Sequence, residues 1–125
     1  MIGIRSKKPF YRNTEERLFA FNSVKTALKN DVFTLKIKGG NEELCKRIED
    51  SSFEVARIND AVNSVNGDFY YDIIPLKYRD RKSDEYIAEV LNCDPTTVRR
   101  NKKRLVERIA VCLYGAGALK EQMKN

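Results

Sequence analysis

The stretch KSDEYIAEVLNCDPTTVRRNKKRLVER, residues 82–108, decides the fold, because it has the spacing of two short helices joined by a tight turn. Ser83 predicts the start of the first helix, since its hydroxyl can accept free backbone N–H groups and two acidic residues follow it. Ile87, Ala88 and Leu91 then form an apolar stripe at helical spacing. The pattern is that of the first half of a helix-turn-helix.

Residue types mark the turn and the second helix. Asn92 tolerates the left-handed backbone conformation that such a turn favours. Asp94 is a good N-cap, and Pro95 suits the first position of a helix. Val98 follows as the inward anchor, at an interval from the small Ala88 that lets the two helices pack tightly. We therefore predict a recognition helix over 95–109.

Cations gather on the face of this predicted helix opposite Val98, at about 100° per residue. Leu105, Ile109 and Cys112 are expected on the inward side with Val98. In a helix-turn-helix, the N-terminal part of the second helix enters the major groove of DNA. The candidates for base edges are Thr96, Arg100 and Lys103, and the candidates for phosphates are Thr97, Arg99, Lys102 and Arg104.

A basic helix face has other interpretations. Cations on a helix often serve only as a solvated surface, and a three-helix unit of this kind can bind proteins alone. The turn chemistry and the spacing together favour double-stranded DNA over both.

Composition narrows the classes of function. The 125 residues carry a net charge of +6, an excess that attracts polyanions without naming one. Histidine is absent and the three cysteines are far apart, so we expect no enzyme and no metal or other cofactor. The odd number of cysteines and the lack of any apolar run of membrane-span or signal-peptide length predict a cytoplasmic protein that does not enter membranes.

The remainder of the chain completes an all-α prediction. Residues 1–12 are a basic arm, which we expect to be loosely ordered rather than a second contact to DNA. Apolar residues at spacings of three and four predict a long helix over 14–38, capped by Asn13. A further helical segment, either one helix or two helices divided at Ser51–Ser52, is expected over 41–66.

The Asn66–Gly67 turn divides the chain into an N-terminal helical region, 1–66, and a DNA-binding region, 67–125. We expect the long helix of the first region either to brace the rest of the chain or to form a homodimer. Pro75 interrupts the first helix of the three-helix unit, which is therefore kinked or starts late. Glycines after residue 114 are expected to leave a loose C-terminal tail.

The string from Ile73 to Gly115 resembles the C-terminal part of phage-encoded transcriptional regulators of the ArpU and RinA type, and also region four of bacterial sigma factors. The resemblance lies in the segments IPLKY, KSDEYIAEVL and TTVRRNKKRLVERIA, and it covers about the last third of the chain closely. Pro75 and Asn92 depart from the family pattern. The resemblance implies a sequence-specific regulator of phage or prophage genes that acts at a promoter with host RNA polymerase.

Two other functions stay open at this point. Small terminase subunits, which package DNA, also join a helix-turn-helix to helical oligomerisation elements. An interaction module that binds RNA polymerase without touching DNA would have the same helical pattern.

Overall fold

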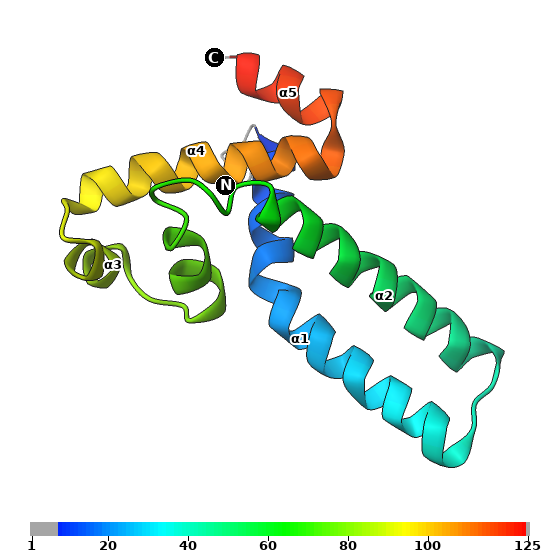
Figure 1. Ribbon diagram of the computed structural model, residues 1–125. Helices are drawn as coiled ribbons and strands as arrows, with labels where there is room; N and C mark the ends of the chain where they lie inside the picture. The colour runs from blue at the N-terminus through cyan, green and yellow to red at the C-terminus, as the bar shows by residue number, and fades with distance from the viewer. Residues whose placement is uncertain (1–7, 125) are drawn as a thin grey trace, which may run out of the picture.

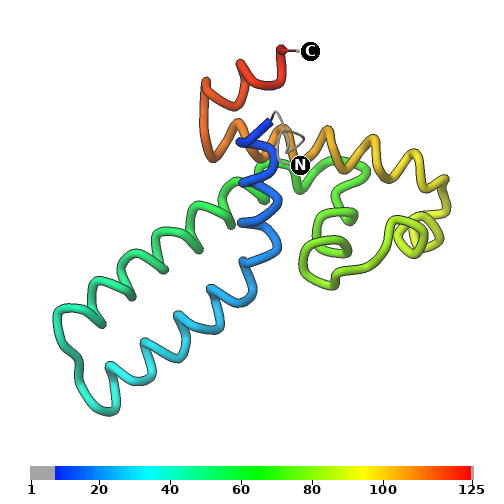
Figure 2. Tube along the Cα trace, turned by 180° about the vertical axis from the view of Figure 1, so that it is seen from behind, coloured from blue at the N-terminus to red at the C-terminus, as the bar shows by residue number. Residues whose placement is uncertain are grey.

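The computed structural model describes residues 8–124, and this part of the chain contains helices and turns but no strand, which confirms the all-α fold. The helices are α1 Pro9–Lys38, α2 Glu42–Asn63, the short π-helical turn η2 Pro75–Arg79, α3 Asp84–Leu91, α4 Pro95–Tyr114 and α5 Ala116–Met123. In Figure 1, α4 crosses the molecule with α3 beside its N-terminal end, and the α1–α2 hairpin leaves from its C-terminal half. Figure 2 shows from behind that the same hairpin projects away from the other helices.

The first helix starts earlier than the sequence predicted. It begins at Pro9, so the expected cap at Asn13 is wrong, and residues 9–12 belong to the helix rather than to an arm. Proline suits this first position because the N–H that it lacks would have no partner within the helix. Residues 1–7 of the predicted arm lie outside the described residues.

The N-terminus of α1 is capped by a residue far away in the sequence. Lys8, at the cap position, forms no hydrogen bond to the helix through its side chain. The carboxylate of Glu121 in α5 instead accepts the N–H groups of Phe10 and Tyr11, at 2.8 and 3.0 Å. A negative charge at this end of a helix also interacts favourably with the helix dipole. Helix α5 therefore stabilises the first turn of α1.

The expectation of a loose C-terminal tail is wrong, because this segment folds as α5. Gly115 ends α4 with a φ of +66°, and α5 starts directly after it. Ala118 is fully buried and Glu121 is 8% exposed. Gly117 faces the ring of Phe10, and a Cβ at this glycine would lie 3.1 Å from the ring. Contacts with α1 thus hold the tail, which no local pattern in the tail itself could show.

We expect Glu121→Ala to lower the free energy of unfolding by about 1–2 kcal/mol, because two backbone donors of α1 lose a charged acceptor. Urea denaturation followed by circular dichroism measures the change. Glu89→Ala, which removes an exposed carboxylate from α3, is the matched control and should change stability by less than about 0.5 kcal/mol. Equal midpoints for both variants would contradict the capping role of Glu121.

The two long helices form an antiparallel hairpin. Gly39 ends α1 at a φ of +75°, and the side chain of Asn41 caps α2 by accepting the N–H of Leu44 at 2.8 Å. Of the one helix or two expected in this segment the structure has one, since α2 continues through Ser51 and Ser52. Two bidentate ion pairs cross the hairpin, Arg17 with Glu54 at 2.6 and 2.8 Å and Arg47 with Asp31 at 2.9 and 3.1 Å.

Between α2 and α3 the chain makes a series of turns before the short π-helical turn η2. The first element of the three-helix unit therefore starts late, which is one of the two outcomes expected from Pro75. The N–H of Asp80 bonds to the carbonyl of Pro75 at 3.0 Å, the wider ring of a π-helix. Tyr78, which is buried, donates its hydroxyl to Glu15 of α1 at 2.6 Å. Burial, followed by this bond, raises the pKa of the Tyr78 phenol.

The buried side chains form two clusters. The smaller cluster lies within the helix-turn-helix and contains Ile73, Ile87, Ala88 and Val98. The larger cluster joins α1 and α2 to η2 and α4, and it contains Leu18, Ile58, Ala61, Val65, Ile74, Tyr78, Leu105, Val106, Ile109 and Leu113. The regions 1–66 and 67–125 therefore share one core, which fixes α4 against the base of the hairpin.

Candidate nucleic-acid interface

The turn between α3 and α4 has the geometry that the sequence predicted. Ser83 accepts the N–H of Tyr86 at 3.1 Å and so caps α3. Asn92 is left-handed, with φ 56° and ψ 53°. Asp94 then caps α4 by accepting the N–H of Thr96 at 2.8 Å, and Pro95 is the first residue of that helix. The predicted caps and turn residue are thus confirmed, and they fix the angle at which α4 leaves α3.

The inward face of α4 is also largely as predicted. Val98, Leu105 and Ile109 are fully buried. Cys112 was expected on the same side but is exposed, and its thiol donates to the hydroxyl of Ser64 at 3.3 Å. At this end of α4 the covering elements are α1, α2 and α5, so the buried stripe moves to Ala110 and Leu113 and away from Cys112.

Four of the predicted DNA-binding side chains lie on the exposed face of α4: Thr96, Arg99, Arg100 and Lys103. Arg100 forms no hydrogen bond or ion pair with any residue in the described part of the chain. Lys103 pairs with Glu107 at 2.9 Å, and Arg99 approaches Asp84 at 3.8 Å. Both cations remain more than half exposed, at 57% and 52% of the side chain. These surface pairs are weak enough to exchange for a phosphate.

The other three predicted residues are less free. Thr97 is half-buried. Lys102 is turned towards α1, where its ammonium group lies 3.9 Å from the carboxylate of Glu15 and its side chain is 18% exposed. Arg104 binds Asp68 through two nitrogens, at 2.8 and 2.9 Å. The geometry therefore favours Arg99, Arg100 and Lys103 over Lys102 and Arg104 as first contacts to an anion.

Asp68 is a neighbour of the candidate site that the sequence reasoning missed. Its carboxylate accepts from Arg104, from Arg108 at 3.4 Å and from the N–H of Tyr70 at 2.9 Å. The hydrogen bonds from Arg104, and after them the one from Tyr70, lower the pKa of Asp68 to about 2. Residues 68 and 104 are 36 positions apart, and no helical periodicity relates them. Their contact is seen only in the structure, where the turn that contains Asp68 packs against α4. It occupies the place on the basic face where a phosphate would have to compete.

The lowered pKa of Asp68 predicts a pH dependence that Asp68→Asn removes. An acid with a depressed pKa stabilises the fold above its unfolded value near 4, and that contribution disappears as the pH falls towards 2. Asparagine retains an acceptor for Tyr70 but loses the charge. This loss should cost about 0.5–1 kcal/mol at neutral pH, since the side chain of Arg104 is 42% exposed. Urea denaturation at pH 5, 3 and 2 measures this, and parallel pH profiles for the variant and the wild-type protein would contradict it.

The positive residues that lead into α3 already have contacts within the molecule. Arg79 binds Asp80 at 2.9 Å, and Lys82 lies over the ring of Tyr86 at 4.9 Å. Arg81, with a φ of +53°, stacks on Phe19 at 4.8 Å. Only the contact of Arg81 reaches another element, α1. All three cations are secondary candidates for phosphate contact.

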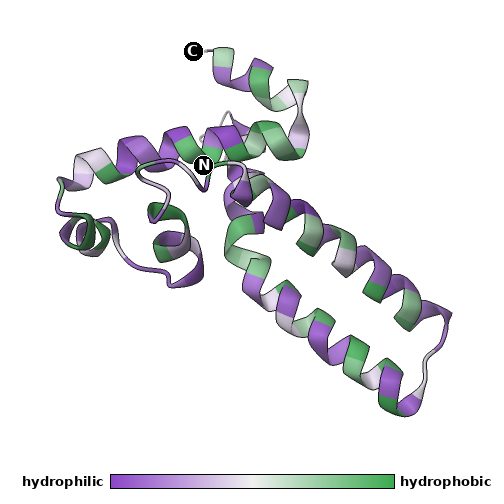
Figure 3. Ribbon diagram, viewed as in Figure 1, coloured by the Kyte–Doolittle hydropathy of each residue, from purple (hydrophilic) through white to green (hydrophobic). Residues whose placement is uncertain are grey.

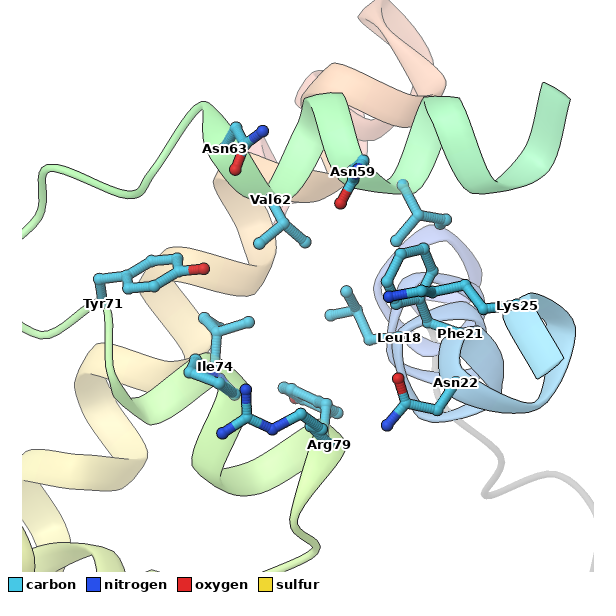
Figure 4. Close-up of a pocket in the computed structure, with 13 residues that line it drawn as sticks. Leu18, Phe21, Asn22, Lys25, Asn59, Val62, Asn63, Tyr71, Ile74 and Arg79 are labelled. Carbon is cyan, nitrogen blue, oxygen red and sulfur yellow. The ribbon is translucent and has the colours of Figure 1, made fainter. Parts of the chain in front are cut away.

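A cavity of about 190 Å³ lies where the hairpin meets η2 (Figure 4). Its floor is apolar, and its rim carries amides such as Asn22 and Asn59 together with Lys25 and Arg79. No carboxylate, thiol or imidazole lines it. Residues 8–124 also contain no group of cysteine or acidic side chains placed to hold a metal ion. The cationic face of α4 is therefore the stronger candidate site.

Comparisons with known proteins add no evidence on the candidate site. No family model, no curated protein and no solved structure matches the chain. None of the helices in the described part of the chain is both long and apolar enough to span a lipid bilayer.

Proposed function

We propose that this protein is a sequence-specific regulator of transcription that binds double-stranded DNA through α4. The observation that carries the proposal is Arg100, an exposed and unpartnered cation on the outer face of the second helix of a helix-turn-helix. The opposite face of that helix is fully buried at Val98, so the helix cannot turn its cations elsewhere. Control of phage or prophage genes and contact with RNA polymerase are proposed from the sequence resemblance alone.

Each exposed side chain has a role in this proposal. The N-terminal half of α4 enters the major groove, where Thr96, Arg100 and Lys103 face base edges. The planar fork of an arginine can donate two hydrogen bonds to O6 and N7 of guanine. Arg99 and Thr97, at the side of the helix, meet phosphates. Arg104 joins them only by exchanging Asp68 for a phosphate oxygen.

Selection of bound sequences from a random duplex pool tests the proposal. We expect a short motif to be enriched, and we expect affinity for it to fall with salt at a logarithmic slope of about −3 to −5, the value for three to five neutralised phosphates. No enrichment, together with no binding at low salt, would refute DNA binding and would favour an interaction module that contacts only proteins.

A further inference from the structure

The end of the hairpin that projects from the molecule has almost no core of its own. We call residues 20–56 the hairpin arm; it comprises α1 from Ala20, the loop, and α2 as far as Ala56. Leu44 is the only buried residue in it. Helices in proteins gain most of their stability from packing rather than from intrinsic propensity. Two helices of this length that bury a single side chain are therefore short of contacts.

The arm is nevertheless rich in apolar residues. Figure 3 shows hydrophobic positions along both helices as far as the loop. Those between the two helices are only half-buried, namely Val24, Leu28, Val32, Leu35, Ile48 and Val55. Outside this seam, Phe33, Ile37 and Phe53 are 63%, 66% and 69% exposed. Two helices cover each other along one line only, whereas a bundle of four encloses such a stripe.

The two helices of the arm carry opposite charges. In α1 the arm has four lysines and one aspartate, and in α2 it has five carboxylates and two cations. Most of these charges are unmatched within the molecule. Seven of the twelve form no ion pair with any residue of 8–124: Lys25, Lys29, Lys36 and Lys38 in α1, and Glu42, Glu43 and Glu49 in α2. The arm thus presents a basic edge and an acidic edge, both available to a partner.

We propose that the partner is a second copy of this chain, bound arm to arm so that α1 of each copy lies beside α2 of the other. One chain carries both edges, so a two-fold arrangement matches the basic edge to the acidic edge twice. The four helices then enclose the half-buried seam and cover the exposed phenylalanines. The dimer itself is independent of DNA binding. A palindromic target, read by two copies of α4, is a consequence that rests on the proposed function.

Sedimentation equilibrium of the full chain tests the dimer. We expect twice the mass of one chain at micromolar concentration. The double variant Phe33→Glu/Ile37→Glu should raise the dimer Kd by about 100-fold or more, because two apolar anchors become charged. Phe69→Glu is the matched control, since Phe69 is 89% exposed but lies outside the arm, and it should leave the Kd unchanged. A monomeric wild-type protein, a larger ring, or equal dissociation by the control would each overturn the proposal.

A second pair of variants, in which charges are exchanged between the two edges of the arm, tests the dimer even if the Phe33→Glu/Ile37→Glu variant does not fold. One variant carries Lys29→Glu/Lys36→Glu, and the other carries Glu42→Lys/Glu49→Lys. Each should dimerise weakly alone, since its two edges have the same sign. An equimolar mixture should restore heterodimers with a Kd within about threefold of the wild-type value, because each edge then meets its opposite. Failure of the mixture to recover would show that the edges do not meet, whatever the outcome of the DNA selection.

Discussion

Arg100→Ala is expected to reduce affinity for the selected DNA site by about 5- to 150-fold, which corresponds to about 1–3 kcal/mol. The expected loss is large because the guanidinium has no internal partner to keep it, so all of its hydrogen bonds are available to the groove. The variant should also lose its preference at one base pair of the site. Fluorescence anisotropy with the selected duplex and its single-base variants measures both effects.

Two further variants separate base recognition from charge. Arg99→Ala should weaken all duplexes alike, since a phosphate contact carries no sequence information. Lys120→Ala removes the same charge from α5, well away from the helix-turn-helix, and should change affinity by less than about twofold. If Arg100→Ala binds every duplex as the wild-type protein does, α4 does not enter the groove in the proposed orientation.

Ile109→Ala is expected to lower the free energy of unfolding by about 2–5 kcal/mol. Ile109 is fully buried in the larger core cluster, which includes side chains from α1, α2, η2 and α4. The change would leave a cavity between α1, α2, η2 and α4. These four elements cannot all shift to fill it, so most of the lost packing is not recovered. A loss of this size is a large part of the stability of a small domain, so the hairpin and the helix-turn-helix should unfold in one weakened transition.

The control for this change is Val90→Ala, which removes methyl groups from an exposed position of α3. It should shift stability by no more than about 0.5 kcal/mol. Urea denaturation followed by circular dichroism compares the two variants. Loss of only part of the helical signal in Ile109→Ala would show that the hairpin folds independently of α4, against the shared core.

The parts of the fold that could be predicted are those with local causes. Ser83, Asn92 and Asp94 act on backbone groups within three residues, so their types alone indicated where α3 begins and ends and where α4 begins. The end of α4 lies five residues beyond the predicted 109, at Tyr114. The start of α1 and the existence of α5 depend on Glu121 and Phe10, which are 111 residues apart. No periodicity in either segment contains that information.

The candidate site divides in the same way. Helical angles placed Arg100 and Lys103 outwards, and the structure has both exposed. The same angles could not show that Lys102 approaches Glu15 or that Arg104 is bound by Asp68, because these acids come from other elements. The side of α4 on which a cation lies depends on that helix alone. Whether the cation also has an acidic partner depends on how the other elements pack against α4.

The bond between Glu121 and the first turn of α1 has a consequence for biosynthesis. A ribosome adds about 5–20 residues per second, so Phe10 is made roughly 5 to 20 seconds before the residue that holds its N–H. The first turn of α1 lacks its cap in the nascent chain for that interval. Termination before codon 121 would leave this turn uncapped permanently, so shortened products should be cleaved more readily by cellular proteases.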